Sequence, residues 1–137
     1  MHFSHIALNC ADLGKSISFY ALYFGFRVSR RLPIGGGKEI VFMKREDLHI
    51  ELFPVEGGHA AKEVDGPSDV GILRHFAFQV DDVDDLIAKM GSDAIVTLGP
   101  LSFDLFIPGW RTVWLRDPDG HIVEVSQGFS DDPKVKD

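Results

Sequence analysis

The chain contains an internal repeat, which limits it to folds built from two similar modules. His5 begins the run His-Ile-Ala-Leu, and His75 begins the similar run His-Phe-Ala-Phe. Glu51 and Glu124 lie in the runs Ile-Glu-Leu and Val-Glu-Val, again at matching positions of the two halves. A carboxylate or imidazole within an apolar strand is costly unless a partner compensates for it. Four such residues in matching places suggest one shared partner, a divalent metal ion.

The order of predicted elements is the same in both halves: one strand, one helix and three further strands. Residues 3–10 and 74–80 are the opening strands. Asp12 and Gly25 are suited to begin and end the first helix, as Asp82 and Gly91 are for the second. The remaining strands are predicted at residues 27–32, 38–43 and 48–53 in the first half. In the second half they are predicted at residues 94–98, 101–106 continued at 111–115, and 121–127. This pattern indicates an α+β fold of two βαβββ modules.

Alternation along the strands separates a polar face from an apolar one. The four His and Glu residues fall on faces with small and polar neighbours, and the opposite faces suit packing beneath the helices. Cys10 falls on an apolar face and is therefore predicted to be a small buried side chain, neither a ligand nor a nucleophile. His49 shares the face of Glu51 and competes with it as a ligand, but Glu51 is the residue that aligns with Glu124.

Length and composition indicate one domain, residues 1–137, with modules at 1–53 and 74–129 joined by a linker at 54–73. The linker is rich in glycine, proline and charge. The formal net charge of −7 argues against a nucleic-acid partner, and no apolar run is long enough to span a membrane. A single cysteine and the lack of a signal-like N-terminus lead us to expect a cytoplasmic protein.

With these motifs in view, the chain resembles the glyoxalase / vicinal oxygen chelate superfamily, which includes glyoxalase I, bleomycin resistance proteins and dioxygenases. The resemblance covers nearly the whole chain, and its most specific part is Asp-Pro-Asp-Gly-His-Ile-Val-Glu at residues 117–124. It implies an eight-stranded cup with the helices outside. One metal ligand would come from the first and last strand of each module, giving the set His5, Glu51, His75 and Glu124.

This ligand set is the one that glyoxalase I uses. The resemblance therefore implies a metal-dependent lyase or isomerase that acts on a small α-oxo or α-hydroxy carbonyl compound, or on its thiol adduct. One divalent transition metal (Zn, Ni, Mn, Fe or Co) would bind two adjacent substrate oxygens and stabilise an enediolate. Glu124 or Glu51 would be the general base that moves the proton. The resemblance also implies a small-molecule substrate and a homodimer, whose sites could combine modules of two subunits.

Other functions of the superfamily remain alternatives. Methylmalonyl-CoA epimerases usually have glutamine where Glu51 stands, and extradiol dioxygenases need two histidines and one glutamate. A binding protein that sequesters a drug would need no ligand set. Glyoxalase I commonly places a glutathione-binding arginine four residues after the first ligand, where this chain has Asn9. Other arginines could serve anionic groups instead, or could form surface salt bridges: Arg27, Arg30, Arg31, Arg74 and Arg111.

Overall fold

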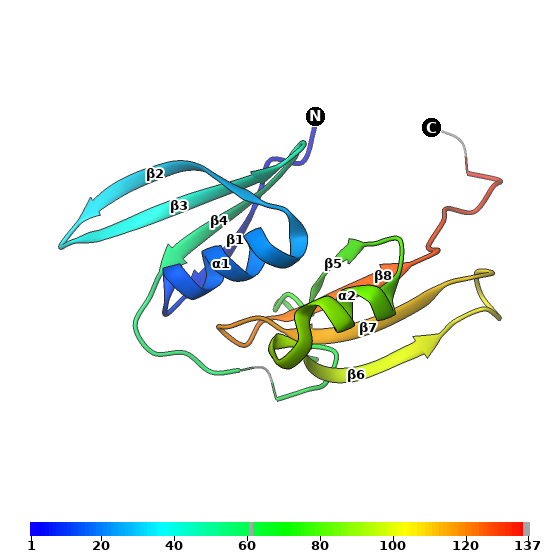
Figure 1. Ribbon diagram of the computed structural model, residues 1–137. Coiled ribbons are helices and arrows are strands. Elements are labelled where there is room, and N and C mark those ends of the chain that lie inside the picture. Colours follow the sequence, from blue (N-terminus) through cyan, green and yellow to red (C-terminus); the bar gives the residue numbers. More distant parts are fainter. Residues whose placement is uncertain (61, 136–137) are drawn as a thin grey trace. The chain divides into compact units, whose positions relative to one another are not determined.

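The first module has the predicted order of elements in the computed structural model, which describes residues 1–60 and 62–135 (Figure 1). A strand, a helix and three strands follow one another, and the sheet has the order β1-β4-β3-β2. β1 runs parallel to β4, and the other neighbouring strands are antiparallel. The elements are β1 (Ile6–Cys10), α1 (Leu13–Phe24), β2 (Arg27–Gly35), β3 (Lys38–Arg45) and β4 (Leu48–Pro54).

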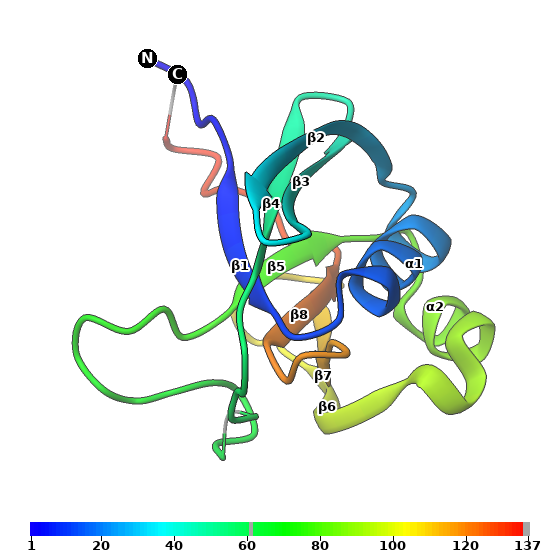
Figure 2. The same ribbon diagram turned by 90° about the vertical axis from the view of Figure 1, so that its left-hand side faces the viewer.

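The second module repeats this topology, with the sheet order β5-β8-β7-β6 and a parallel β5–β8 pair. Helix α2 packs on β7 and β8, and Figure 2 shows it beside the short helical turn η1 that follows it. The elements are β5 (Phe76–Gln79), α2 (Val83–Met90), η1 (Gly91–Asp93), β6 (Ile95–Ser102), β7 (Arg111–Arg116) and β8 (Ile122–Gln127). The prediction of two βαβββ modules is therefore confirmed.

Both helices begin and end where the sequence places their caps. The side chain of Asp12 accepts a hydrogen bond from the backbone N–H of Lys15, and Asp82 does the same for Asp85. Gly25 ends α1 in the left-handed conformation, with φ of 70°. Local sequence chemistry thus fixes the ends of both helices.

Each helix covers the apolar face of its own sheet, where the buried side chains gather. The first core consists of Leu8, Cys10, Phe19, Tyr20, Phe24, Phe26, Val41, Met43, Ile50 and Leu52. The second consists of Val83, Leu86, Met90, Val113, Leu115, Val123 and Val125, while Trp114 and Ile122 are buried on the opposite face, which they share with Glu124. No helix among residues 1–60 and 62–135 is both long and apolar enough to cross a membrane.

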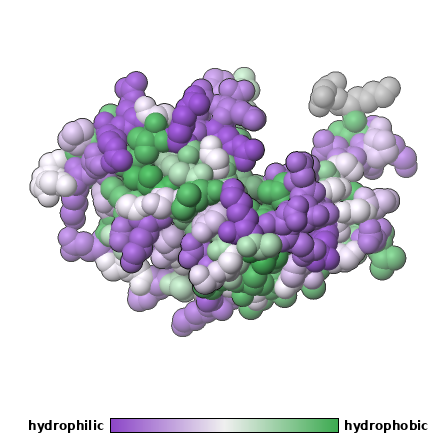
Figure 3. Space-filling view, viewed as in Figure 1, coloured by the Kyte–Doolittle hydropathy of each residue, from purple (hydrophilic) through white to green (hydrophobic). Residues whose placement is uncertain are grey.

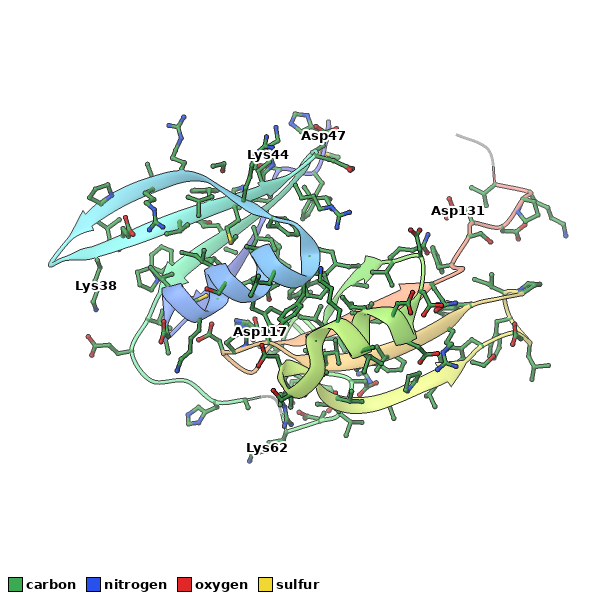
Figure 4. All side chains as sticks on the ribbon, in the orientation of Figure 1. Lys38, Lys44, Asp47, Lys62, Asp117 and Asp131 are labelled. Atoms are coloured by element: carbon green, nitrogen blue, oxygen red, sulfur yellow. The ribbon has the colours of Figure 1, made fainter. Side chains whose placement is uncertain are left out.

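The chain divides into two compact units, and the first unit contains the turn Asp117–Gly120 as well as residues 1–60. This turn joins β7 to β8. Figure 4 labels Asp117 in this turn. The hydroxyl of Tyr20 donates to Oδ2 of Asp117 at 2.7 Å. Asp119 accepts from the backbone N–H of Ala11, also at 2.7 Å. The turn is thus anchored on the first module, a role that its sequence motif did not reveal.

The sixth strand differs from the prediction. Gly99 and Pro100 were expected to separate two strands, but β6 runs through both and ends at Ser102, so residues 103–106 are not a strand. β6 is an edge strand, where a proline without an N–H is tolerated, and its register with β7 shifts between Leu98 and Leu101. A Cβ on Gly99 would lie 2.9 Å from the carbonyl oxygen of Thr112, so glycine permits the close approach of β7.

Candidate metal centre

His5 and Glu51 form the first of two His–Glu pairs. β1 and β4 lie side by side with Ala7 opposite Glu51, so the imidazole of His5, the residue before β1, reaches the carboxylate. Nε2 of His5 lies 3.3 Å from Oε2 of Glu51. On the other side of the ring, Nδ1 lies 2.9 Å from the hydroxyl of Ser4. The His5 side chain is 39% exposed and that of Glu51 17%, so this pair is accessible to a ligand.

His75 and Glu124 form the second pair, in the second unit. Their Nε2 and Oε2 atoms are 2.8 Å apart. Nδ1 of His75 lies 2.7 Å from the carbonyl oxygen of Asp65, which can only accept, so we assign the ring proton to Nδ1. The hydroxyl of Thr112 donates to the other carboxylate oxygen of Glu124, at 2.8 Å. Each member of this pair therefore has one supporting contact, His75 with the Asp65 carbonyl and Glu124 with Thr112.

The supporting groups set the direction of both imidazoles. In metal sites a ligating histidine commonly uses its second nitrogen for a hydrogen bond, which fixes the tautomer and the ring orientation. Ser4 and the Asp65 carbonyl occupy this position, and both Nε2 atoms are directed at a carboxylate. Sequence analysis missed Ser4, Asp65 and Thr112. The parity of β7, which puts Thr112 on the face of Glu124, was a signal for Thr112 alone.

The structure thus brings the four predicted residues together as two pairs, one in each unit. Among residues 1–60 and 62–135, no three His, Cys, Asp or Glu side chains gather as a metal-binding group within the structure. Neutral imidazole and carboxylate are nonetheless the donors that divalent transition metals take, and four of them leave coordination positions for substrate. The donor chemistry fits such an ion.

An open cavity of about 460 Å³ adjoins the first pair. The ring of Phe42 packs edge-on against that of His5, with 5.4 Å between ring centroids. His49, the alternative ligand, also lines this cavity. The complete lining is His2, Phe3, Ser4, His5, Phe42, Asp47 and His49. Space for a small molecule therefore exists beside His5.

Cys10 has the buried position that strand parity predicts. It is 1% exposed, and burial raises the pKa of its thiol to about 12. A thiol with such a pKa stays protonated near neutral pH and is a poor nucleophile. The prediction of a structural cysteine is confirmed.

Comparison with known proteins identifies the family of the chain. The model of the Glyoxalase/Bleomycin resistance protein/Dioxygenase superfamily matches residues 2–125. The uncharacterized protein PA2024 of Pseudomonas aeruginosa is 30% identical over 129 residues, which cover 91% of this chain and 87% of the relative.

Two solved structures share the fold. The trypanothione-dependent glyoxalase I of Leishmania major superposes with a TM-score of 0.67 at 24% identity, covering 93% of this chain and 87% of the other. A variant of the fosfomycin resistance protein FosX from Listeria monocytogenes, in complex with Mn(II) and a dihydroxypropylphosphonic acid, superposes with a TM-score of 0.72 at 18% identity. It covers 93% of this chain, and this chain covers 92% of it. The chain belongs to the Glyoxalase/Bleomycin resistance protein/Dioxygenase superfamily.

Proposed function

We propose that this protein is a metal-dependent lyase or isomerase of the glyoxalase I type. Its substrate would be a small α-oxo or α-hydroxy carbonyl compound or the thiol adduct of one. The observation that carries the proposal is the pair of His–Glu contacts at matching positions of the two modules, 3.3 Å and 2.8 Å long. Trypanothione-dependent glyoxalase I and Mn(II)-bound FosX share the fold, which supports a metal-based activity.

The proposed metal is one divalent transition ion (Zn, Ni, Mn, Fe or Co) held by His5, Glu51, His75 and Glu124. When bound, it would act as a Lewis acid for negative charge that develops on two adjacent substrate oxygens. Because the two pairs lie in separate units, a shared ion requires both modules to contribute, from one chain or from two.

Proton transfer is assigned to the protein itself. One glutamate would accept the proton from the carbon beside the substrate carbonyl and return it to the neighbouring carbon. We propose Glu124 for this role, because Thr112 donates to one of its oxygens and thereby orients the carboxylate, whose other oxygen lies 2.8 Å from Nε2 of His75. Glu51 is the alternative base.

Metal content provides the first test. Purified protein should contain one divalent transition metal per site by elemental analysis, and His5→Ala or His75→Ala should lower this content sharply, because each substitution removes a ligating nitrogen. His59→Ala is the matched control, since this exposed histidine lies outside both pairs. Full metal occupancy in the double variant His5→Ala/His75→Ala would refute the ligand assignment.

Activity provides the second test. Methylglyoxal with a panel of thiols, including glutathione, should be consumed by the metal-loaded protein. Metal without this activity would favour another member of the superfamily, such as an epimerase or dioxygenase. Retention of small molecules without any dependence on metal would favour a binding protein. We further propose a homodimer and a cytoplasmic location.

A further inference from the structure

β2 contains a bulge that changes which side chains share its face. Arg27 pairs with Lys44 of β3, and Arg30 pairs with Phe42, with a register shift between Val28 and Arg30. Lys44 and Phe42 are two residues apart and point to the same side of the sheet. Arg27 and Arg30, three residues apart, therefore share that side, which regular alternation would forbid. A bulge that redirects a side chain in this way is common beside binding sites.

The redirected arginines lie on the sheet face that bears Glu51. Phe42 is the partner of Arg30 and also of Glu51, so these three residues form one row across the sheet. Lys44 pairs with Arg27 on one side and with His49 on the other, so these three residues form a second row. Phe42 and His49 line the cavity beside His5. β2 lies two strands from β4, or roughly 10 Å at ~4.8 Å per strand, within reach of an arginine side chain.

Arg27, Arg30 and Lys44 have no acidic partner within the described residues, although the chain as a whole carries an excess of acid. Arg31 points to the other face of β2 and pairs with Glu39, and Arg74 and Arg111 also pair with aspartates. No ion pair involves Arg27, Arg30 or Lys44 among residues 1–60 and 62–135.

Asp47, in the turn that follows β3, does not neutralise Lys44. Figure 4 labels both residues near the same end of β3, yet no ion pair joins them in the described part of the chain. Figure 3 shows hydrophilic side chains gathered over this end of the first sheet. A cation kept free in an acidic protein is available for an anionic ligand.

We propose that Arg30 and Lys44, with Arg27 at the sheet edge, form an anion-binding subsite that holds a carboxylate or a phosph(on)ate group of the substrate. The inference rests on the proposed function for the reaction and adds to it a substrate class: an oxygenated compound with an anionic group several bonds from its reacting carbons. The cavity beside His5 would hold the part between them. Arg30 is the specificity-determining residue, because the bulge directs it to the row of Glu51.

The test uses metal-free full-length protein, so that it stands apart from the metal hypothesis. Phosphate, L-lactate and the neutral propane-1,2-diol are titrated separately, and binding is followed by NMR signals of the arginine side chains. Phosphate or lactate should shift the Arg30 signal, and Arg30→Gln should weaken binding about tenfold, as expected for the loss of one charge-assisted hydrogen bond. Tighter binding of phosphate or of lactate identifies which anion the subsite prefers.

Arg31→Gln is the matched control, since it removes the same charge from the neighbouring residue on the opposite face. Its anion affinity should stay within twofold of the unmodified protein. Equal weakening in Arg30→Gln and Arg31→Gln would reveal only a general charge effect and would overturn the subsite. Unchanged affinity in Arg30→Gln, or equal binding of the neutral diol, would overturn it as well. Absence of metal from the native protein would instead refute the proposed function.

Discussion

Glu51 and Glu124 occupy matching positions but are held differently. Glu124 has a contact of 2.8 Å with each of His75 and Thr112, whereas Glu51 has one of 3.3 Å with His5. If Glu124 is the base, Glu124→Gln should keep appreciable metal and lose roughly 10²–10⁴-fold in turnover. Glu51→Gln should lose activity only in proportion to lost metal. Bound metal and turnover are measured on the same samples, and a metal-replete, fully active Glu124→Gln would move the role to Glu51.

Cys10 gives the folded state a dependence on alkaline pH. Its thiol has an ordinary pKa of 9.0, which burial raises to about 12. The unfolded chain thus loses this proton first, so the stabilisation is complete below pH 9 and is lost as the pH rises towards 12. Cys10→Ala should show a smaller decline of unfolding free energy over this range. Urea unfolding at several pH values measures it, and parallel pH profiles of the two proteins would contradict the expectation.

The helices show what local sequence can predict. Asp12, Gly25 and Asp82 act at the positions assigned to them, because a cap depends on only a few neighbouring residues. The matching His and Glu positions could also be found, since strand parity and the repeat are visible in the sequence. Three features could not be predicted: the bulge of β2, the path of β6 through Gly99 and the contact of His75 with Asp65. They depend on the partner strand or on a distant loop.

The N-cap of α2 should contribute measurably to the stability of the fold. Asp82 accepts a hydrogen bond from the backbone N–H of Asp85 at 2.9 Å. Asp82→Ala would leave this donor without its cap, at a cost of about 1 kcal/mol in unfolding free energy. Asp81→Ala removes the same charge from the exposed preceding residue and is the control. Denaturant unfolding should separate the two variants, and equal stabilities would show that the cap contributes nothing beyond charge.

At the scale of the molecule, the turn Asp117–Gly120 connects distant parts of the sequence. Tyr20 is fully buried and donates to Asp117, which is 5% exposed. Burial and the neighbouring Asp117 carboxylate raise the pKa of Tyr20, so the hydroxyl keeps the proton that it donates. Tyr20→Phe should lower the unfolding free energy by roughly 1–3 kcal/mol, because a buried carboxylate oxygen loses a donor. Unaltered urea unfolding of this variant would show that the hydrogen bond does not stabilise the fold.

The proposed homodimer leads to a prediction about the origin of each metal site. The linker at residues 54–73 contains no helix or strand in its described part beyond the end of β4, so its sequence permits pairing of modules within one chain or between two. Mixing differently tagged His5→Ala and His75→Ala chains distinguishes these arrangements. If sites combine modules from two subunits, the mixed dimer contains one site with both histidines and regains half of the native metal content.

If each site is built within one chain, every site in the mixed dimer lacks a histidine, and its metal content stays at the level of the single variants. Purification through both tags isolates the mixed species, and elemental analysis measures its metal. Half occupancy would assign each site to two subunits, and metal at the level of the single variants would assign it to one chain. A monomer by light scattering at micromolar concentration would contradict the dimer itself. It would leave both His–Glu pairs as they are, since each is formed within a single unit.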